Sequence, residues 1–214
     1  MRTVALWALA ALLAIGAGGC YLGHLFVALT KPKEYKHIKA EYDLQAERLV
    51  IVPYAGADIQ FQYPTVPIEI SNEVVYALGR NLKDKVRSVV PPLVVVQWQE
   101  SNLEWPNLSL PEVGRLFQAD TLLYVELEQY TMLEENSADL LRGRARARVQ
   151  VVKPAADRHP AYDGAAEVLF PKDHPVGRLQ TSQGAMRQST NRLLAEEIVN
   201  KFRDRKVEVV GGEP

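Results

Sequence analysis

A long hydrophobic run opens the chain. From Val4 to Leu29 it has no Lys, Arg, Asp or Glu, and Arg2 is the only such residue in the first thirty. A positive start, an apolar stretch and a group of small residues are typical of a secretory signal peptide. The run is also longer than the roughly 20 residues that cross a bilayer as a helix. The pattern therefore predicts that residues 1–30 are a signal peptide or a membrane anchor.

Cys20 is the only cysteine of the chain, and it directly follows small residues. This order resembles a bacterial lipoprotein signal, in which the cysteine is acylated and becomes the new amino terminus. We therefore expect lipidation at Cys20, which stabilises membrane attachment by about 0.8 kcal/mol per buried methylene. An uncleaved single-pass anchor and a plain cleaved signal remain alternatives. The reason is that Tyr21–Leu29 stays apolar, and Ala17 stands where such signals usually carry leucine.

The sequence after the hydrophobic run predicts a linker and one folded domain. Residues 31–44 begin with a charged stretch that contains Pro32 and are typical of a linker. A chain of 214 residues with 47% hydrophobic content can bury a single core, so we expect one α/β domain over residues 45–205. Residues 206–214 include two glycines and are predicted to be a tail.

Apolar runs and apolar periodicity predict the elements of this domain. Two short runs rich in β-branched residues, 48–54 and 93–98, predict strands buried on both faces, the first of them central in the sheet. Ser109 and Glu112 have the spacing of a capping box, which predicts the start of a short helix. A helix between the two strands would place these residues on its inner face: Ile70, Val74, Leu78, Leu82 and Val86. A long helix over 184–203 would bury Met186, Leu193, Leu194, Ile198 and Phe202.

Two segments alternate between apolar and polar residues, which predicts an antiparallel hairpin over 121–130 and 141–152. Its outer face would carry Tyr124, Glu126, Glu128 and Tyr130 on the first strand and Arg142, Arg144, Arg146 and Arg148 on the second. We expect Glu126 opposite Arg146 and Glu128 opposite Arg144, a ladder worth about 0.2–1 kcal/mol per pair. A third strand over 164–170 would extend the meander. The predicted fold class is therefore α/β (α+β): a small mixed sheet with an antiparallel meander, flanked by two longer helices and one short helix.

Composition and motifs argue against several functions. The net charge of −1 offers no basic surplus for binding nucleic acid. The predicted domain has no cysteine, and no two of the histidines are spaced as metal ligands on one element: His24, His37, His159 and His174. The loop after the first predicted strand lacks the glycines and lysine of a phosphate loop, and no serine has a nucleophile-elbow pattern around it. We therefore expect no enzymatic activity, no metal and no cofactor.

Aromatic residues in polar segments are the candidates for contact with a protein partner. Trp98 and Trp105 lie among glutamine and asparagine residues, whereas Phe61 and Tyr63 lie in a segment that ends at Pro64. Tryptophan and tyrosine often anchor a partner protein. The alternative is that these aromatic rings cover the core or pack at the edge of the sheet.

The order of the predicted elements, the opening run Arg48–Tyr54 and the segment Gly114–Val125 resemble a group of bacterial periplasmic lipoprotein modules. This group includes the curli-secretion lipoprotein, the penicillin-binding-protein activator lipoprotein and the amino-terminal domain of TolB. The resemblance covers roughly residues 45–205. It implies a membrane-anchored protein at the periplasmic face of the bacterial cell envelope, whose non-catalytic domain binds an envelope protein or assembles with its own copies. The alternative is a single-pass membrane protein whose domain has an unrecognised enzymatic or small-ligand-binding role.

Overall fold

The computed structural model describes residues 35–155 and 159–208. The predicted leader and its Cys20 lie outside the described residues. Residues 39–205 form one unit, and a second unit contains β1 (Tyr35–Ile38) and most of β7 (Arg205–Glu208), which pair as a two-stranded sheet. Within the described residues, every helix is too short or too polar to span a bilayer.

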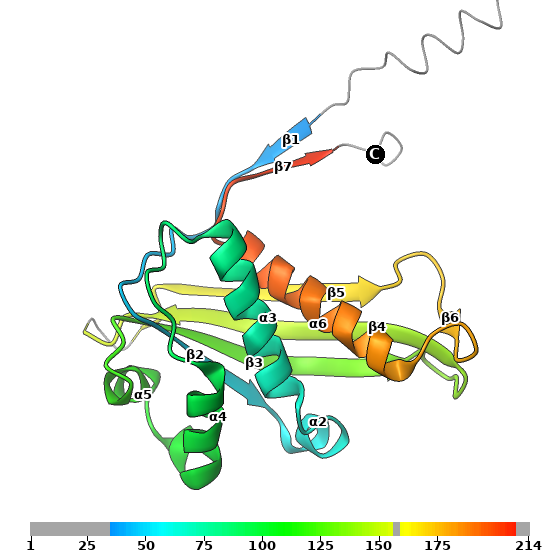
Figure 1. The fold of residues 1–214 in the computed structure, drawn as a ribbon, viewed down its shortest axis with the longest axis horizontal. Helices are drawn as coiled ribbons and strands as arrows, with labels where there is room; N and C mark the ends of the chain where they lie inside the picture. Colours follow the sequence, from blue (N-terminus) through cyan, green and yellow to red (C-terminus); the bar gives the residue numbers. More distant parts are fainter. Residues whose placement is uncertain (1–34, 156–158, 209–214) are drawn as a thin grey trace, which may run out of the picture. The chain divides into compact units, whose positions relative to one another are not determined.

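The larger unit is built on a five-stranded sheet (Figure 1). Its strands are β2 (Leu49–Ala55), β3 (Thr121–Leu133), β4 (Leu140–Val152), β5 (Tyr162–Phe170) and β6 (Val176–Gly177). β2 and β3 are parallel, β3, β4 and β5 form an antiparallel meander, and β6 pairs with the start of β4. This mixed sheet confirms the predicted fold class.

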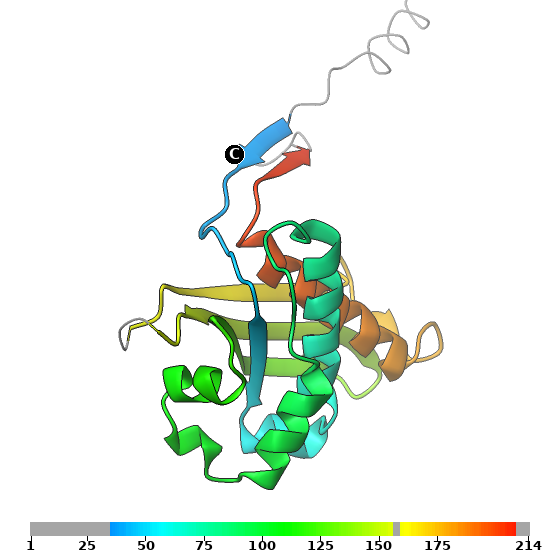
Figure 2. The ribbon, with the colours of Figure 1, turned by 60° about the vertical axis from the view of Figure 1, so that its left-hand side comes forward.

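Helices cover the two faces of the sheet unequally (Figures 1 and 2). α3 (Val66–Asn81) and α6 (Gln183–Asn200) pack side by side on one face, over the larger hydrophobic core. α4 (Pro92–Ser101) and α5 (Leu110–Leu116) contact β2 and β3 and enclose a smaller core on the opposite face. Two short helices, α2 (Ala57–Gln62) and the 3-10 helix η1 (Trp105–Asn107), follow β2 and α4.

The position of β2 differs from the prediction, because β2 lies at an edge of the sheet and not at its centre. It is still buried on both faces: Ile51 belongs to the larger core, whereas Val50 and Val52 belong to the smaller one. The chain before α4 lies along the first half of its free edge, where the Val90 N–H donates to the Leu49 carbonyl at 2.8 Å. Helices on both faces can therefore give an edge strand the apolar sequence of a central one.

The predicted strand over 93–98 is wrong, because this segment is helix α4. Pro92 stands in its first turn, where a missing N–H group has no cost and the fixed φ angle favours a helix. Only one face of α4 is buried: Val95 is fully buried, while the side chains of Leu93 and Val94 are 53% and 48% exposed. A short apolar run cannot be assigned to a strand or a helix by periodicity alone.

The other predicted helices form with shifted ends. α3 ends at Asn81, so Val86 lies beyond it and pairs with Ala46 in an isolated bridge. The capping box of α5 is confirmed, since the Ser109 N–H donates to Glu112 Oε2 at 2.8 Å. α6 ends at Asn200, so Phe202 follows it. The residues predicted for its inner face are buried except Leu193, which is 36% exposed.

The hairpin of β3 and β4 has its acids and arginines on one face, as predicted, but its register is different. Glu126 lies opposite Arg148 and not Arg146, and the register shifts between Leu127 and Gln129. This shift is a β-bulge at Glu128, an extra residue that reverses the alternation of faces beyond it. Tyr130 is therefore buried in the larger core, whereas the sequence pattern predicted it on the outer face.

Candidate functional site

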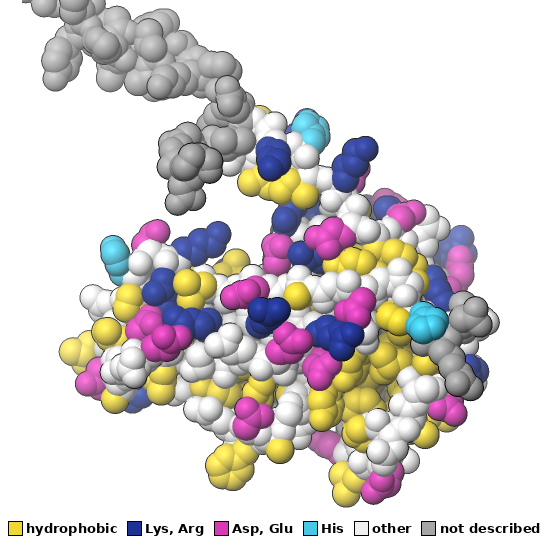
Figure 3. All heavy atoms as spheres, turned by 180° about the vertical axis from the view of Figure 1, so that it is seen from behind, with side chains coloured by type: hydrophobic (Ala, Val, Ile, Leu, Met, Phe, Trp, Pro, Cys, Tyr) yellow, Lys and Arg dark blue, Asp and Glu magenta, His cyan; other side chains and the backbone are white. Residues whose placement is uncertain are grey.

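The outer face of β4 carries an ionic network that is paired within the molecule. Figure 3 shows this face, on which basic and acidic side chains alternate and hydrophobic side chains gather to one side. Arg146 Nε lies 2.9 Å from Glu128 Oε2, and Arg148 Nη2 lies 2.6 Å from Asp163 Oδ2. The hydrogen bond from Arg148 holds the pKa of the Asp163 carboxyl group below its ordinary value.

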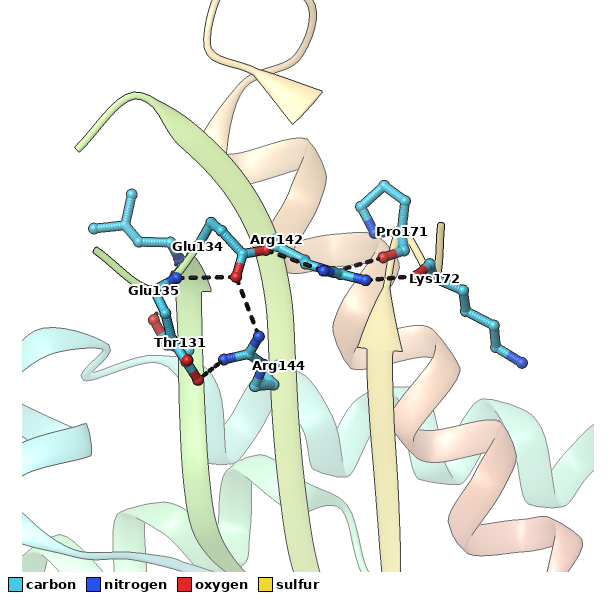
Figure 4. A network of polar contacts seen from close by, with 8 residues as sticks. Thr131, Glu134, Glu135, Arg142, Arg144, Pro171 and Lys172 are labelled. Carbon is cyan, nitrogen blue, oxygen red and sulfur yellow. Dashed lines mark hydrogen bonds and ion pairs between the residues drawn. The ribbon is translucent and has the colours of Figure 1, made fainter. Parts of the chain in front are cut away.

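The same network continues at the tip of the hairpin (Figure 4). Glu134 accepts from both Arg142 and Arg144 at 3.2 Å, and Arg144 also pairs with Glu135. Arg142 in addition donates to the backbone carbonyls of Pro171 and Lys172. Because each of these arginines already has a carboxylate partner, we assign the network to structure and not to substrate binding.

A polar hollow between α3 and α6 is also internally paired. Arg187 Nε lies 3.2 Å from Glu69 Oε2, and Asn191 Nδ2 donates to the same oxygen at 2.9 Å. The Tyr130 hydroxyl donates to Asn191 Oδ1 at 2.5 Å. These contacts join both helices to β3. In the described part of the chain, no group of three or more His, Asp or Glu side chains is placed to hold a metal ion.

A groove of the domain lies at the carboxyl end of β2. It has a volume of about 340 Å³ and is bordered by α2, the start of α3, the end of α4 and η1. The apolar and aromatic part of its lining includes Tyr54, Val96, Leu103, Trp105 and four prolines, Pro53, Pro64, Pro67 and Pro106. Gln60, Gln99 and Glu100 give the lining a polar part of similar extent. A volume near the lower end of the range for ligand pockets suits one or two side chains.

Two glutamine side chains close the edge of β2 inside this groove. Gln99 Nε2 donates to the Pro53 carbonyl at 2.8 Å, and Gln60 Nε2 donates to the Ala55 carbonyl at 2.8 Å. Pro53 itself has no N–H group to offer. The end of β2 is therefore blocked against the addition of another strand.

Trp105 stands between this groove and a second hollow of about 330 Å³ on the outer side of the sheet. Its ring packs edge-to-face on Tyr54 with centroids 5.8 Å apart, and Tyr54 in turn stacks on Tyr124 at 6.4 Å. Burial raises the pKa of the Tyr124 hydroxyl group. Glu126 and Arg148 form part of the second hollow, so the aromatic surface passes directly into the ionic face.

The structure separates the four predicted contact residues. Trp105 lines the groove, and Trp98 lies 6.4 Å from it by ring centroids but packs in the smaller core. Phe61 is 93% exposed on α2 and is not among the residues that line the groove. Tyr63 is buried, and its hydroxyl accepts from the Met132 N–H at 3.3 Å.

Leu103 is the contact candidate that the sequence patterns missed. It is 81% exposed and lines the groove beside Trp105. A strand over 93–98 would have placed the following segment in an ordinary loop, with no reason to single out one leucine. The signal that could have identified α4 is Pro92 in its first turn.

Comparisons with known proteins give a weak structural likeness. No protein-family model matches the sequence, and no curated protein matches it. Among solved structures, a PelC dodecamer from Paraburkholderia phytofirmans has a TM-score of 0.46 and 10% identity, covering 81% of this chain and 99% of that chain. Lipoprotein GNA1162 from Neisseria meningitidis has a TM-score of 0.45 and 14% identity, covering 65% and 89%. A minor lipoprotein from Acinetobacter baumannii has a TM-score of 0.34 and 11% identity, covering 75% and 98%. These TM-scores and identities are too low to indicate a shared function.

Proposed function

We propose that this protein is a lipid-anchored protein of the bacterial cell envelope whose domain binds another protein and catalyses no reaction. The groove beside Trp105 carries the second part of this proposal. Its wall includes a half-buried tryptophan and the exposed side chain of Leu103. Tryptophan and tyrosine dominate the binding energy of many protein interfaces, and exposed apolar side chains around such a residue favour a partner that covers them.

The internal pairing of the charged groups supports binding over catalysis. A general acid or base has to be free to reach a substrate. The carboxylates and arginines of the two polar networks instead contact each other, as Glu69 contacts Arg187 and Asp163 contacts Arg148. The groove itself offers apolar surface, amide groups and a single carboxylate, on Glu100.

Cys20→Ser tests the anchor. We expect the natural protein to fractionate with membranes and to begin at an acylated Cys20, because acylation requires the thiol at that position. The variant should accumulate as unprocessed precursor, as measured by mass analysis of its amino terminus. Identical processing and membrane retention of both proteins would rule out lipidation and support the single-pass anchor.

A photo-crosslinking amino acid at position 103 tests the binding groove in intact cells. We expect one adduct of defined mass from this position and none from position 179, because Leu179 is even more exposed but lies away from the groove, in the turn after β6. Trp105→Ala should weaken binding by about 30-fold or more, since truncating a hot-spot residue costs about 2 kcal/mol or more. A melting curve checks that this variant remains folded. Equal adducts from both positions would contradict a specific interface at the groove.

A further inference from the structure

The two segments that form the groove contain no basic residue. From Leu49 to Gly79 and from Ser88 to Gly114 there is no Lys, Arg or His, although the chain has 25 Lys and Arg. The same segments contain six acids: Asp58, Glu69, Glu73, Glu100, Glu104 and Glu112. Every residue that lines the groove comes from these two segments.

One acid lines the groove, and Asp58 and Glu104 adjoin lining residues in the chain. Glu100 is the only charged residue of its lining, and Glu104 directly precedes Trp105 in the chain. Asp58 and Glu100 are exposed, and within the described residues neither carboxylate has a Lys or Arg nitrogen within 4.0 Å. Several carboxylates elsewhere on the surface are instead paired with arginine or lysine, among them Asp43, Glu128 and Asp163. The groove therefore combines apolar side chains with a negative rim, in which Glu100 is unpaired among the residues that the structure describes and Asp58 and Glu104 follow or precede lining residues in the chain.

The closed edge of β2 limits how a chain can occupy this groove. The carbonyls of Pro53 and Ala55 already accept from Gln99 and Gln60, and Pro53 cannot donate. Recognition by strand addition would have to break both glutamine contacts. A bound chain is instead held through its side chains, one of which can fill the apolar cavity while its neighbours reach the rim.

We propose, building on the protein-binding function above, that the groove takes a segment of a partner protein that carries a bulky apolar residue flanked by Lys or Arg. The apolar side chain enters between Leu103 and Trp105, where it is removed from water. The flanking cations face the carboxylates of Glu100, Glu104 and Asp58. A like-charged segment is rejected, because juxtaposed like charges at an interface are unfavourable.

The test uses the full-length protein in detergent and two fluorescein-labelled peptides, KKPLFPKK and EEPLFPEE, with binding followed by fluorescence anisotropy. The peptides share their apolar centre and differ only in the sign of their charge. We expect the basic peptide to bind and the acidic peptide to bind at least about fivefold more weakly, because one exposed ion pair contributes up to about 1 kcal/mol. Raising the salt concentration from about 0.1 M to about 1 M should weaken binding of the basic peptide, since the Debye length falls from about 10 Å to about 3 Å.

Glu100→Lys and Asp84→Lys form a matched pair of variants with the same change in net charge. Asp84 is exposed and follows the carboxyl end of α3, whereas the groove contacts the amino-terminal end of that helix. We expect Glu100→Lys to weaken the affinity for the basic peptide by about fivefold or more. Asp84→Lys should change that affinity by less than about twofold. Equal losses in both variants would show an effect of net charge and overturn the proposal.

The outcomes distinguish this proposal from the function on which it rests. A specific adduct at position 103 with equal binding of both peptides keeps the protein-binding groove and overturns its charge preference. An adduct whose mass is that of a second copy of this chain overturns the basic segment as the occupant. The absence of both an adduct and peptide binding overturns the protein-binding function together with this inference.

Discussion

Replacing Phe202 with alanine is expected to lower the free energy of unfolding by about 3–5 kcal/mol, which is a large part of the stability of a typical domain. Phe202 follows α6 and is fully buried in the larger core. Its ring packs edge-to-face on Tyr162 at 5.4 Å and on Tyr42 at 6.5 Å between centroids. Alanine would leave a cavity between α6, β5 and the segment that precedes β2.

Leu193→Ala is the control for this prediction, because the sequence pattern placed both residues on the inner face and the structure separates them. Leu193 is partly exposed on α6, so its truncation should cost less than about 1 kcal/mol. Chemical denaturation of both variants, with fluorescence and circular dichroism as probes, measures the difference. Equal losses would mean that α6 is rotated so that Leu193 is buried as deeply as Phe202.

Gly143→Ala is expected to destabilise the domain by about 1–3 kcal/mol through overpacking. A Cβ atom at this position of β4 would lie 1.8 Å from Thr190 Oγ1, which is far inside van der Waals contact. Thr190 has little freedom to move away, since it is fully buried and its hydroxyl donates to the Met186 carbonyl at 2.9 Å. α6 would have to shift away from the sheet, and the midpoint of thermal unfolding should fall.

Thr190→Ala tests the cause of that loss. It removes Oγ1 and Cγ2, two of the three atoms that approach the new Cβ, and leaves the Thr190 Cβ at 3.0 Å. The double variant should therefore lose less free energy of unfolding than the sum of the two single losses, by about 0.5 kcal/mol or more. Strictly additive losses would locate the strain somewhere other than the contact between β4 and α6.

The hairpin illustrates how far patterning leads. Alternation correctly placed the acids and the arginines on one face, because successive outer residues of β4 are two positions apart in the chain. The bulge at Glu128 leaves no mark on local composition, since Glu128 and Gln129 are both ordinary exposed residues. Beyond the bulge, Tyr130 faces α6 and donates to Asn191, a residue 61 positions further along the chain. The register of this hairpin is therefore accompanied by contacts with α6 that the local sequence does not reveal.

The candidate site was predictable only where local sequence suffices, as for Trp105, and not where the position of a residue depends on the fold. Trp105 could be identified because tryptophan in a polar segment is uncommon on a free surface. Tyr63 looked equivalent in sequence, but its ring lies 5.0 Å from that of Tyr130 in the core, a contact that only the path of α2 creates. Leu103 depended on knowing that the preceding apolar run is a helix. In contrast, the lack of basic residues around the groove is visible in the sequence without any structure.

That lack of basic residues also determines how the domain is digested. Trypsin cleaves after Lys and Arg, so it releases the groove as two long peptides, 49–80 and 88–115, bounded by Arg48, Arg80, Arg87 and Arg115. All the groove-lining residues are contained in these two fragments. A chemical label attached to any groove-lining residue is thus found in one of these two peptides in a peptide map. A label on the arginine-rich β4 appears in short peptides instead.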